Sequence, residues 1–102
     1  MAEGYEPKYI TPVEFNAVEH ITDLGSIANK NLDDLIDKTY VGYWSSKNRD
    51  SILNKPANFA GTFFFFNTGT DRCLQFCVGT GNGDVYLRFV SGTTVYNWTK
   101  IN

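Results

Sequence analysis

Few side chains in this 102-residue chain could do chemistry: one histidine, two cysteines and eleven acidic residues. His20 has no serine or cysteine at a motif spacing around it, so the sequence does not indicate a nucleophile and base pair. Cys73 and Cys77 lie four apart in a predicted strand, which separates them by about 13 Å. A disulfide needs Cα atoms within about 7 Å, and a zinc site needs more ligands than one histidine supplies. We therefore expect reduced thiols, no metal and no cofactor.

The acidic residues of the second half do not form a catalytic pair. Asp50, Asp71 and Asp84 lie at predicted turn positions, where aspartate commonly bonds the local backbone. The glycine-rich segment 79–83 lacks the lysine and the helix of a phosphate-binding loop, and its Asn-Gly step is typical of a hairpin turn. We predict that the chain is not an enzyme.

Aromatic side chains are unusually frequent, and thirteen of the sixteen lie from residue 40 onward. Rings stack on the faces of sugars, while amide, carboxylate and guanidinium groups bond sugar hydroxyls. A glycan-binding group is therefore predicted from Tyr43, Trp44, Tyr86, Arg88 and Trp98. The alternative for each single ring is packing in a core.

Charge divides the chain into two parts. Residues 1–40 hold eight acidic and three basic side chains, a net charge of −5, whereas residues 41–102 hold three and six, a net charge of +3. The basic residues are scattered, and the pI is near 5.2, which argues against nucleic-acid binding. The longest apolar run is far shorter than the roughly 20 residues of a membrane span, and the N-terminus does not look like a secretory signal. We expect synthesis in a cytoplasm and no membrane insertion.

The first part carries the pattern of a helix. Thr11-Pro12-Val13-Glu14 combines an N-cap threonine, a proline at the first helical position and a glutamate at the third. A narrow apolar stripe follows at helical spacing and is the predicted helical part of an oligomer interface: Ile21, Leu24, Ala28 and Leu35. The alternative is one amphipathic helix packed on its own domain, which Gly25-Ser26 or residues 29–31 would break into two pieces.

From residue 40 the sequence is typical of β-structure. Five β-rich runs cover residues 40–45, 59–67, 72–78, 84–91 and 94–101, and short turns between the last four predict an antiparallel meander. The run of four phenylalanines at 63–66 needs cover on both faces, which a small meander does not provide. We expect association through Phe64 and Phe66, the alternative being cover by the N-terminal helix within a monomer.

The predicted fold class is α+β: an N-terminal arm and helical stalk over residues 1–39, then a small antiparallel β-meander over residues 40–102. In chain order, short motifs of the second part resemble the knob domains of phage tail fibres and pyocin fibres. They are Asn31-Leu32-Asp33-Asp34-Leu35, Gly42-Tyr43-Trp44, Asn54-Lys55-Pro56, Leu74-Gln75-Phe76, Val85-Tyr86-Leu87-Arg88 and Trp98-Thr99-Lys100-Ile101. Upstream, residues 10–19 resemble the helix opening of fibre and baseplate proteins. The chain departs from the family in having one closing tryptophan and no long shaft.

The resemblance implies a homotrimeric virion structural protein, with the helix as a stalk or adaptor and the β part as a distal knob. Because the shaft is missing, we expect a short head or tail fibre, or a decoration protein, made in the cytoplasm of the host bacterium. Its N-terminal arm would anchor to other virion proteins of the capsid or tail through Tyr5 and Tyr9. The knob would serve host attachment by touching host-surface glycans. The competing prediction is a monomeric carbohydrate- or nucleic-acid-binding module.

Overall fold

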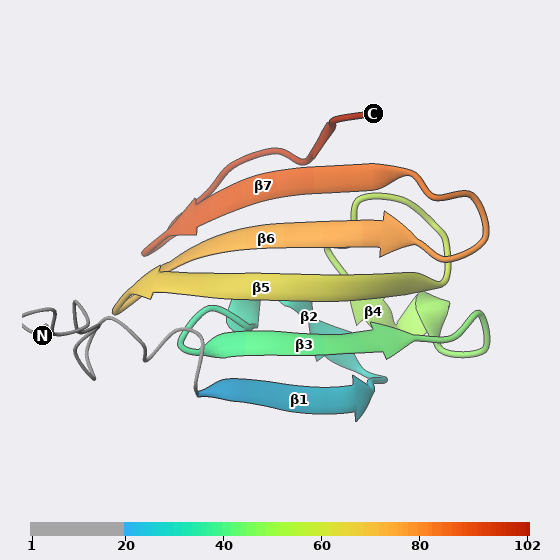
Figure 1. The fold of residues 1–102 in the computed structure, drawn as a ribbon, viewed down its shortest axis with the longest axis horizontal. Helices are drawn as coiled ribbons and strands as arrows, with labels where there is room; N and C mark the ends of the chain where they lie inside the picture. Colours follow the sequence, from blue (N-terminus) through green and yellow to red (C-terminus); the bar gives the residue numbers. More distant parts are fainter. Residues whose placement is uncertain (1–19) are drawn as a thin grey trace, which may run out of the picture.

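The structure is a computed structural model, and it describes residues 20–102. The strands are β1 Ile21–Ser26, β2 Lys30–Asn31, β3 Thr39–Trp44, β4 Ile52–Leu53, β5 Gly61–Gly69, β6 Arg72–Gly79, β7 Val85–Ser91, β8 Thr94–Val95 and β9 Thr99–Lys100. Two 3-10 turns accompany them, η1 Leu32–Asp34 and η2 Arg49–Ser51. One mixed sheet has the strand order β1-β3-β5-β6-β7-β8, with β9 also paired to β7, and β2 and β4 form a second, short sheet. Figure 1 shows β2 and β4 behind the five long strands.

The prediction of an N-terminal helical stalk, and with it the α+β class, is wrong over the described residues. Residues 20–102 contain no α-helix, and β1 occupies part of the predicted helix. Gly25 has a φ of +62°, which does not occur within an α-helix, and its N–H donates to Asp23 Oδ1 at 2.9 Å. This local turn replaces the helical hydrogen bonds. The fold is mostly β, and its sheet is mixed because β1 and β3 pair in parallel.

The four residues predicted to line a helical seam do not share one face. Ile21 and Leu24 belong to β1, Ala28 follows that strand, and Leu35 comes directly after η1. Leu35 is buried in the core of its own chain, and Leu24 packs against the same core. Of the four residues only Leu35 is buried; Leu24 and Ala28 are half-buried, and Ile21 is 41% exposed, so the three- and four-residue spacing did not mark one buried face. The predicted helix start at residues 11–14 lies outside the described residues.

The connection between β1 and β3 provides the cover for one face of the sheet. It is a dozen residues long, which is the minimum for a crossover between parallel strands. The crossover contains β2 and η1, and it lies with β4 over the sheet (Figure 1). We call the covered side the core face. Its buried residues are Ile27, Leu32, Leu35, Tyr40, Trp44, Ile52, Phe63, Phe65, Cys73 and Cys77.

The phenylalanine run alternates between the two faces of the sheet. Phe63 and Phe65 are 2% and 0% exposed on the core face, whereas Phe64, 39% exposed, and Phe66 lie on the opposite face. β5, β6, β7 and β8 are antiparallel neighbours in chain order. β1 pairs with β3 across the predicted division between residues 1–39 and 40–102, and that division stays a prediction. Within residues 20–102 no helix is long and apolar enough to span a membrane.

Burial makes both cysteine thiols weaker acids than a thiol in water. Desolvation raises the pKa of Cys73 from 9.0 to about 12, and it raises the pKa of Cys77 as well. The neighbouring Arg88 guanidinium opposes both shifts without cancelling them. The folded chain therefore keeps protons that the unfolded chain releases above about pH 9.

This difference predicts that stability declines in alkaline solution. The stabilising contribution of each thiol is complete below the ordinary value of 9.0 and is lost as the pH rises towards the folded-state value. Urea denaturation under reducing conditions from pH 7 to 10.5 should show the free energy of unfolding falling above pH 9, by up to about 1.4 kcal/mol per pH unit for each thiol. Cys77→Ala should reduce that slope. A free energy of unfolding that stays constant over this range would contradict the burial of the thiols.

Candidate binding site around Arg88 and Trp98

A pocket of about 240 Å³ opens on the core-face side of the molecule, beside β7. It is formed by η1, the loop after β4, the strand β7 and the segment from β8 to β9. Its lining residues are Asp33, Asn54, Lys55, Arg88, Val95, Tyr96, Asn97 and Trp98. The pocket therefore joins parts of the chain that are up to about 65 residues apart in sequence.

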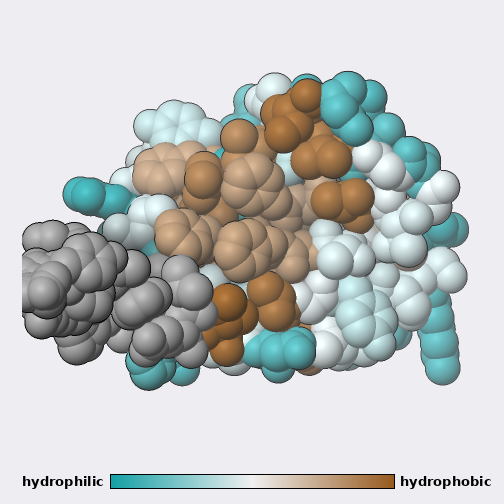
Figure 2. All heavy atoms as spheres, viewed as in Figure 1, coloured by the Kyte–Doolittle hydropathy of each residue, from teal (hydrophilic) through white to brown (hydrophobic). Residues whose placement is uncertain are grey.

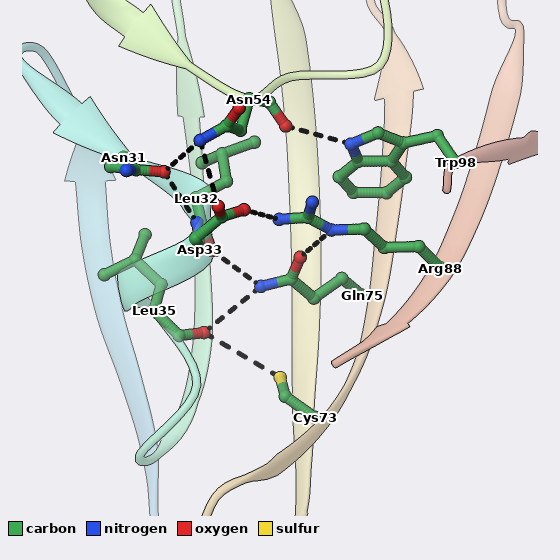
Figure 3. Close-up of polar contacts among 9 residues, drawn as sticks. All are labelled: Asn31, Leu32, Asp33, Leu35, Asn54, Cys73, Gln75, Arg88 and Trp98. Atoms are coloured by element: carbon green, nitrogen blue, oxygen red, sulfur yellow. Dashed lines mark hydrogen bonds and ion pairs between the residues drawn. The ribbon is translucent and has the colours of Figure 1, made fainter. Parts of the chain in front are cut away.

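Arg88 is the buried charge of this site. Its side chain is only 3% exposed, and it points from β7 to the core face. Nε donates to Gln75 Oε1 at 2.6 Å, and Nη2 donates to Asp33 Oδ1 at 2.8 Å (Figure 3). A guanidinium group suits this position because its donors are held in a rigid plane. The buried positive charge thus has a carboxylate partner and a neutral acceptor.

Gln75 links the arginine to the backbone of the crossover. Its side chain is fully buried on β6, directly opposite Arg88 in the strand register. Nε2 donates to the carbonyl oxygen of Leu32 at 2.8 Å and to that of Leu35 at 3.4 Å. Leu32 begins η1 and Leu35 follows its end, and the Leu32 carbonyl also accepts from the Leu35 N–H at 3.4 Å. The amide therefore fixes η1 on the sheet.

Asn54 and Asn31 hold Asp33 in place. Asn54 Nδ2 donates to Asn31 Oδ1 at 2.8 Å and to Asp33 Oδ2 at 3.0 Å. Asn31 Oδ1 also accepts from the Asp33 backbone N–H at 2.9 Å and so caps η1. Asn54 has a φ of +63°, a conformation that asparagine adopts more readily than most residues. Both carboxylate oxygens of Asp33 are thus engaged, one by Asn54 and one by Arg88.

Trp98 covers the arginine from the C-terminal side. The Arg88 Cζ atom lies 4.5 Å from the centroid of the indole ring, which is a cation–π contact. The indole N–H donates to the Asn54 carbonyl oxygen at 2.9 Å and ties the C-terminal segment to the loop after β4. Next to it, Tyr96 is 56% exposed and stacks on Phe89. Because Phe89 points away from the core face, the Tyr96 ring lies on the other side of the sheet, and Trp98 is the aromatic ring that borders the pocket.

Only two of the five residues predicted to bind glycans come together here, Arg88 and Trp98. Trp44 is 1% exposed, which corrects its assignment, because a buried ring in the core cannot stack on a ligand. Tyr43 is 49% exposed on the opposite face, since neighbouring residues of a strand point to opposite sides. Tyr86 lies on the core face with its ring edge-on to a neighbouring phenylalanine.

Four further residues of the site, Asn31, Asp33, Asn54 and Gln75, are not among the predicted site residues, although each belongs to a motif of the resemblance. The sequences of β6 and β7 nevertheless contain a pattern that could have identified two residues of the network. Gln75 and Arg88 each stand between two large apolar residues. An inward-pointing polar residue in such a strand requires a buried partner. What the sequence did not contain was the partner, because η1 lies more than 40 residues from both.

The remaining predictions concern the anchoring tyrosines, metal binding and the phenylalanines of the oligomer interface. Tyr5 and Tyr9, predicted to anchor the chain to a particle, lie outside the described residues. Within residues 20–102 no cluster of three or more histidine, cysteine or carboxylate side chains is placed to hold a metal ion. Phe64 and Phe66 lie on the face of the sheet opposite the core face.

The fold is similar to that of two pyocin fibre structures. An N-truncated R2-type pyocin tail fibre matches with a TM-score of 0.62 and 20% sequence identity over 78% of this chain. A C-terminal fragment of the P. aeruginosa R1 pyocin fibre matches with a TM-score of 0.63 and 25% identity, also over 78%. This chain covers 31% and 21% of their respective lengths. No protein-family model and no curated protein matches. The fold is therefore tail-fibre-like, in agreement with the resemblance of the sequence motifs.

Proposed function

We propose that this chain is a structural subunit of a phage particle, a short head or tail fibre or decoration protein that assembles as a homotrimer. Its N-terminal segment anchors to other virion proteins of the capsid or tail, and its β domain is displayed for attachment to the host surface. It acts by binding and not by catalysis. The similarity to pyocin tail fibres supports a fibre-related structural role.

The observation that carries this proposal is the second face of the sheet, which we call the outer face. The strand register places nine apolar side chains on it: Val41, Phe64, Phe66, Leu74, Phe76, Val78, Val85, Leu87 and Phe89. Figure 2 shows a continuous apolar area over the middle of the sheet on this side. No element of residues 20–102 packs over it, because the crossover, β2 and β4 all lie on the core face.

The size of the outer face indicates an interface. Four strands spaced by about 4.8 Å, each with about six residues at ~3.3 Å, give a face of roughly 380 Å². The largest apolar patch on a soluble monomer covers about 300–600 Å² and is often functional. Identical copies arranged about a symmetry axis cover such faces mutually, and a closed arrangement leaves none of them exposed. A polar rim would add the remaining contact area that a stable interface needs.

Phe76→Glu should convert the assembly into monomers. Phe76 lies on β6 opposite Phe64 and Leu87, in the middle of the outer face. Assembly would bury three unpaired carboxylates together, which is strongly unfavourable. Light scattering on the purified full chain should show a mass of three chains for the wild type and one chain for the variant.

The matched control is Leu53→Glu, on β4, which is 57% exposed and lies on the other side of the sheet. This variant should keep the three-chain mass, and circular dichroism should show that both variants remain folded. A wild-type chain that is monomeric, or a Phe76→Glu variant that still assembles, would refute the assignment of the outer face.

A monomeric carbohydrate-binding module is the second candidate function. The pocket between Arg88 and Trp98 favours it, because such a pocket can bind a ligand without any assembly. The same light-scattering measurement separates the two functions. A monomer that binds sugars would favour the module, whereas a trimer would favour the fibre.

A further inference from the structure

Within residues 20–102, the Nη1 group of the buried Arg88 donates to no protein acceptor. Arg88 uses Nε for Gln75 and Nη2 for Asp33, and within the described residues Nη1 has no hydrogen-bond partner. Figure 3 shows this nitrogen directed towards the space between Asn54 and Trp98. The side chain is 97% buried, and a buried guanidinium donor that lacks an acceptor is costly. An acceptor supplied from the pocket would complete the site.

The charges around the pocket favour an anionic acceptor. Asp33 is the lining carboxylate, and its two oxygens are already engaged by Arg88 and Asn54. Lys55 also lines the pocket, half-buried, with its ammonium group donating to the Ile52 carbonyl at 3.1 Å. That contact uses one of its three donors. After Arg88 is paired with Asp33, Lys55 leaves one positive charge without a carboxylate partner among the lining residues.

The remaining lining suits a sugar ring. A volume of about 240 Å³ accommodates one pyranose. Trp98 offers aromatic surface, and Asn54 and Asn97 offer amide groups for hydroxyls. An inorganic anion would use the guanidinium and ammonium groups but would leave the indole ring and the amides without a role.

We propose that this pocket binds an acidic sugar of the hexuronate class, with the sugar carboxylate accepting from Arg88 Nη1 and from Lys55. The sugar ring packs beside Trp98. The ligand class deepens the attachment role in the proposed function, while the pocket itself depends only on contacts within one chain. The site lies on the core-face side, so a ligand there does not compete with assembly through the outer face.

The test is a titration of the isotope-labelled full chain with sodium D-glucuronate, followed by NMR. D-glucose is the matched ligand because it differs from glucuronate only in having a hydroxymethyl group in place of the carboxylate. We expect the Trp98 indole N–H signal and the Asn97 amide signal to shift with saturation at millimolar glucuronate. Glucose should bind at least tenfold more weakly, and sodium acetate should not saturate these signals in the same range.

Lys55→Met tests the second cation without removing the buried arginine. It should weaken glucuronate binding at least fivefold, while Lys47→Met, a change of an exposed lysine outside the pocket, should leave binding unchanged. Absence of saturable shifts at Trp98, or equal affinity for glucose and glucuronate, would overturn the proposal. Equal affinity for acetate would overturn the sugar part by showing a bare anion site.

The glucuronate titration and the light-scattering measurement test the two proposals separately. A trimer that does not bind glucuronate would refute this inference alone. A monomer that binds glucuronate with the expected selectivity would refute the fibre assembly and leave the inference standing.

Discussion

Arg88→Met is expected to lower the free energy of unfolding by about 3–5 kcal/mol, because it removes one member of a buried ion pair. The variant leaves Asp33 Oδ1 without its donor at 2.8 Å and the fully buried Gln75 Oε1 without its donor at 2.6 Å. The cation–π contact with Trp98 is lost as well. Methionine fills much of the space but replaces none of these bonds.

Urea denaturation of the wild type and the variant measures this loss. Arg72→Met is the matched control, since Arg72 is an exposed arginine on the neighbouring strand β6, and it should change the free energy of unfolding by less than about 0.5 kcal/mol. Asp33→Asn combined with Arg88→Met should cost less than the sum of the two single changes, because the two side chains act as a pair. A loss for Arg88→Met as small as that for Arg72→Met would show that the buried network is not formed.

Trp44→Ala is expected to cost about 3–5 kcal/mol, which separates a core tryptophan from a ligand-binding one. The ring is 1% exposed, and its N–H donates to the Phe59 carbonyl at 2.6 Å. It lies stacked with Phe63 and fits over Gly61, where an added Cβ would meet the ring at 2.5 Å. Truncation therefore opens a large cavity and leaves a carbonyl without its donor.

Tyr43→Ala provides the comparison in the same strand. Tyr43 is 49% exposed, and its removal should cost less than about 1 kcal/mol by the same denaturation measurement. If Trp44→Ala were as mild as Tyr43→Ala, the ring would not be a core residue. The two adjacent aromatic residues thus report directly on which face of β3 is covered.

The two faces of the sheet differ in role: the core face borders the pocket, and the outer face is the proposed interface between copies of the chain. Arg88 and Gln75 point to the core face, where they fasten η1 and border the pocket. Their strand neighbours Phe76 and Leu87 point to the outer face, where we propose that copies of the chain meet. In a trimer the pocket would be present three times, and repeated weak sites raise the overall affinity for a surface that carries many copies of the ligand.

The helix prediction failed for a physical reason that the sequence itself contains. The stripe through Ile21, Leu24, Ala28 and Leu35 satisfies helical spacing, but spacing alone does not establish that these residues share one buried face, and Ile21 is 41% exposed. Gly25 with positive φ and the Asp23 carboxylate bonded to its N–H favour a local turn, and tertiary pairing with β3 supplies the backbone hydrogen bonds that a helix would have made internally. The pairing of β1 with β3 therefore determined the secondary structure of this segment, against the local helical spacing.

The sequence by itself determined β3, β5, β6 and β7 and the turns that join β5, β6 and β7, because alternation and turn residues are local properties. It did not predict β4, and the predicted run 94–101 forms two separate short strands, β8 and β9. It also determined that the phenylalanine run has an apolar side to cover. Only the tertiary structure decided that Trp44 is a core residue and that β1 is a strand. It also brought Asp33 and Asn54 to Arg88, Gln75 and Trp98 to make one network. Those contacts join residues far apart in the chain, and no local pattern specifies which distant partner a buried polar side chain will meet.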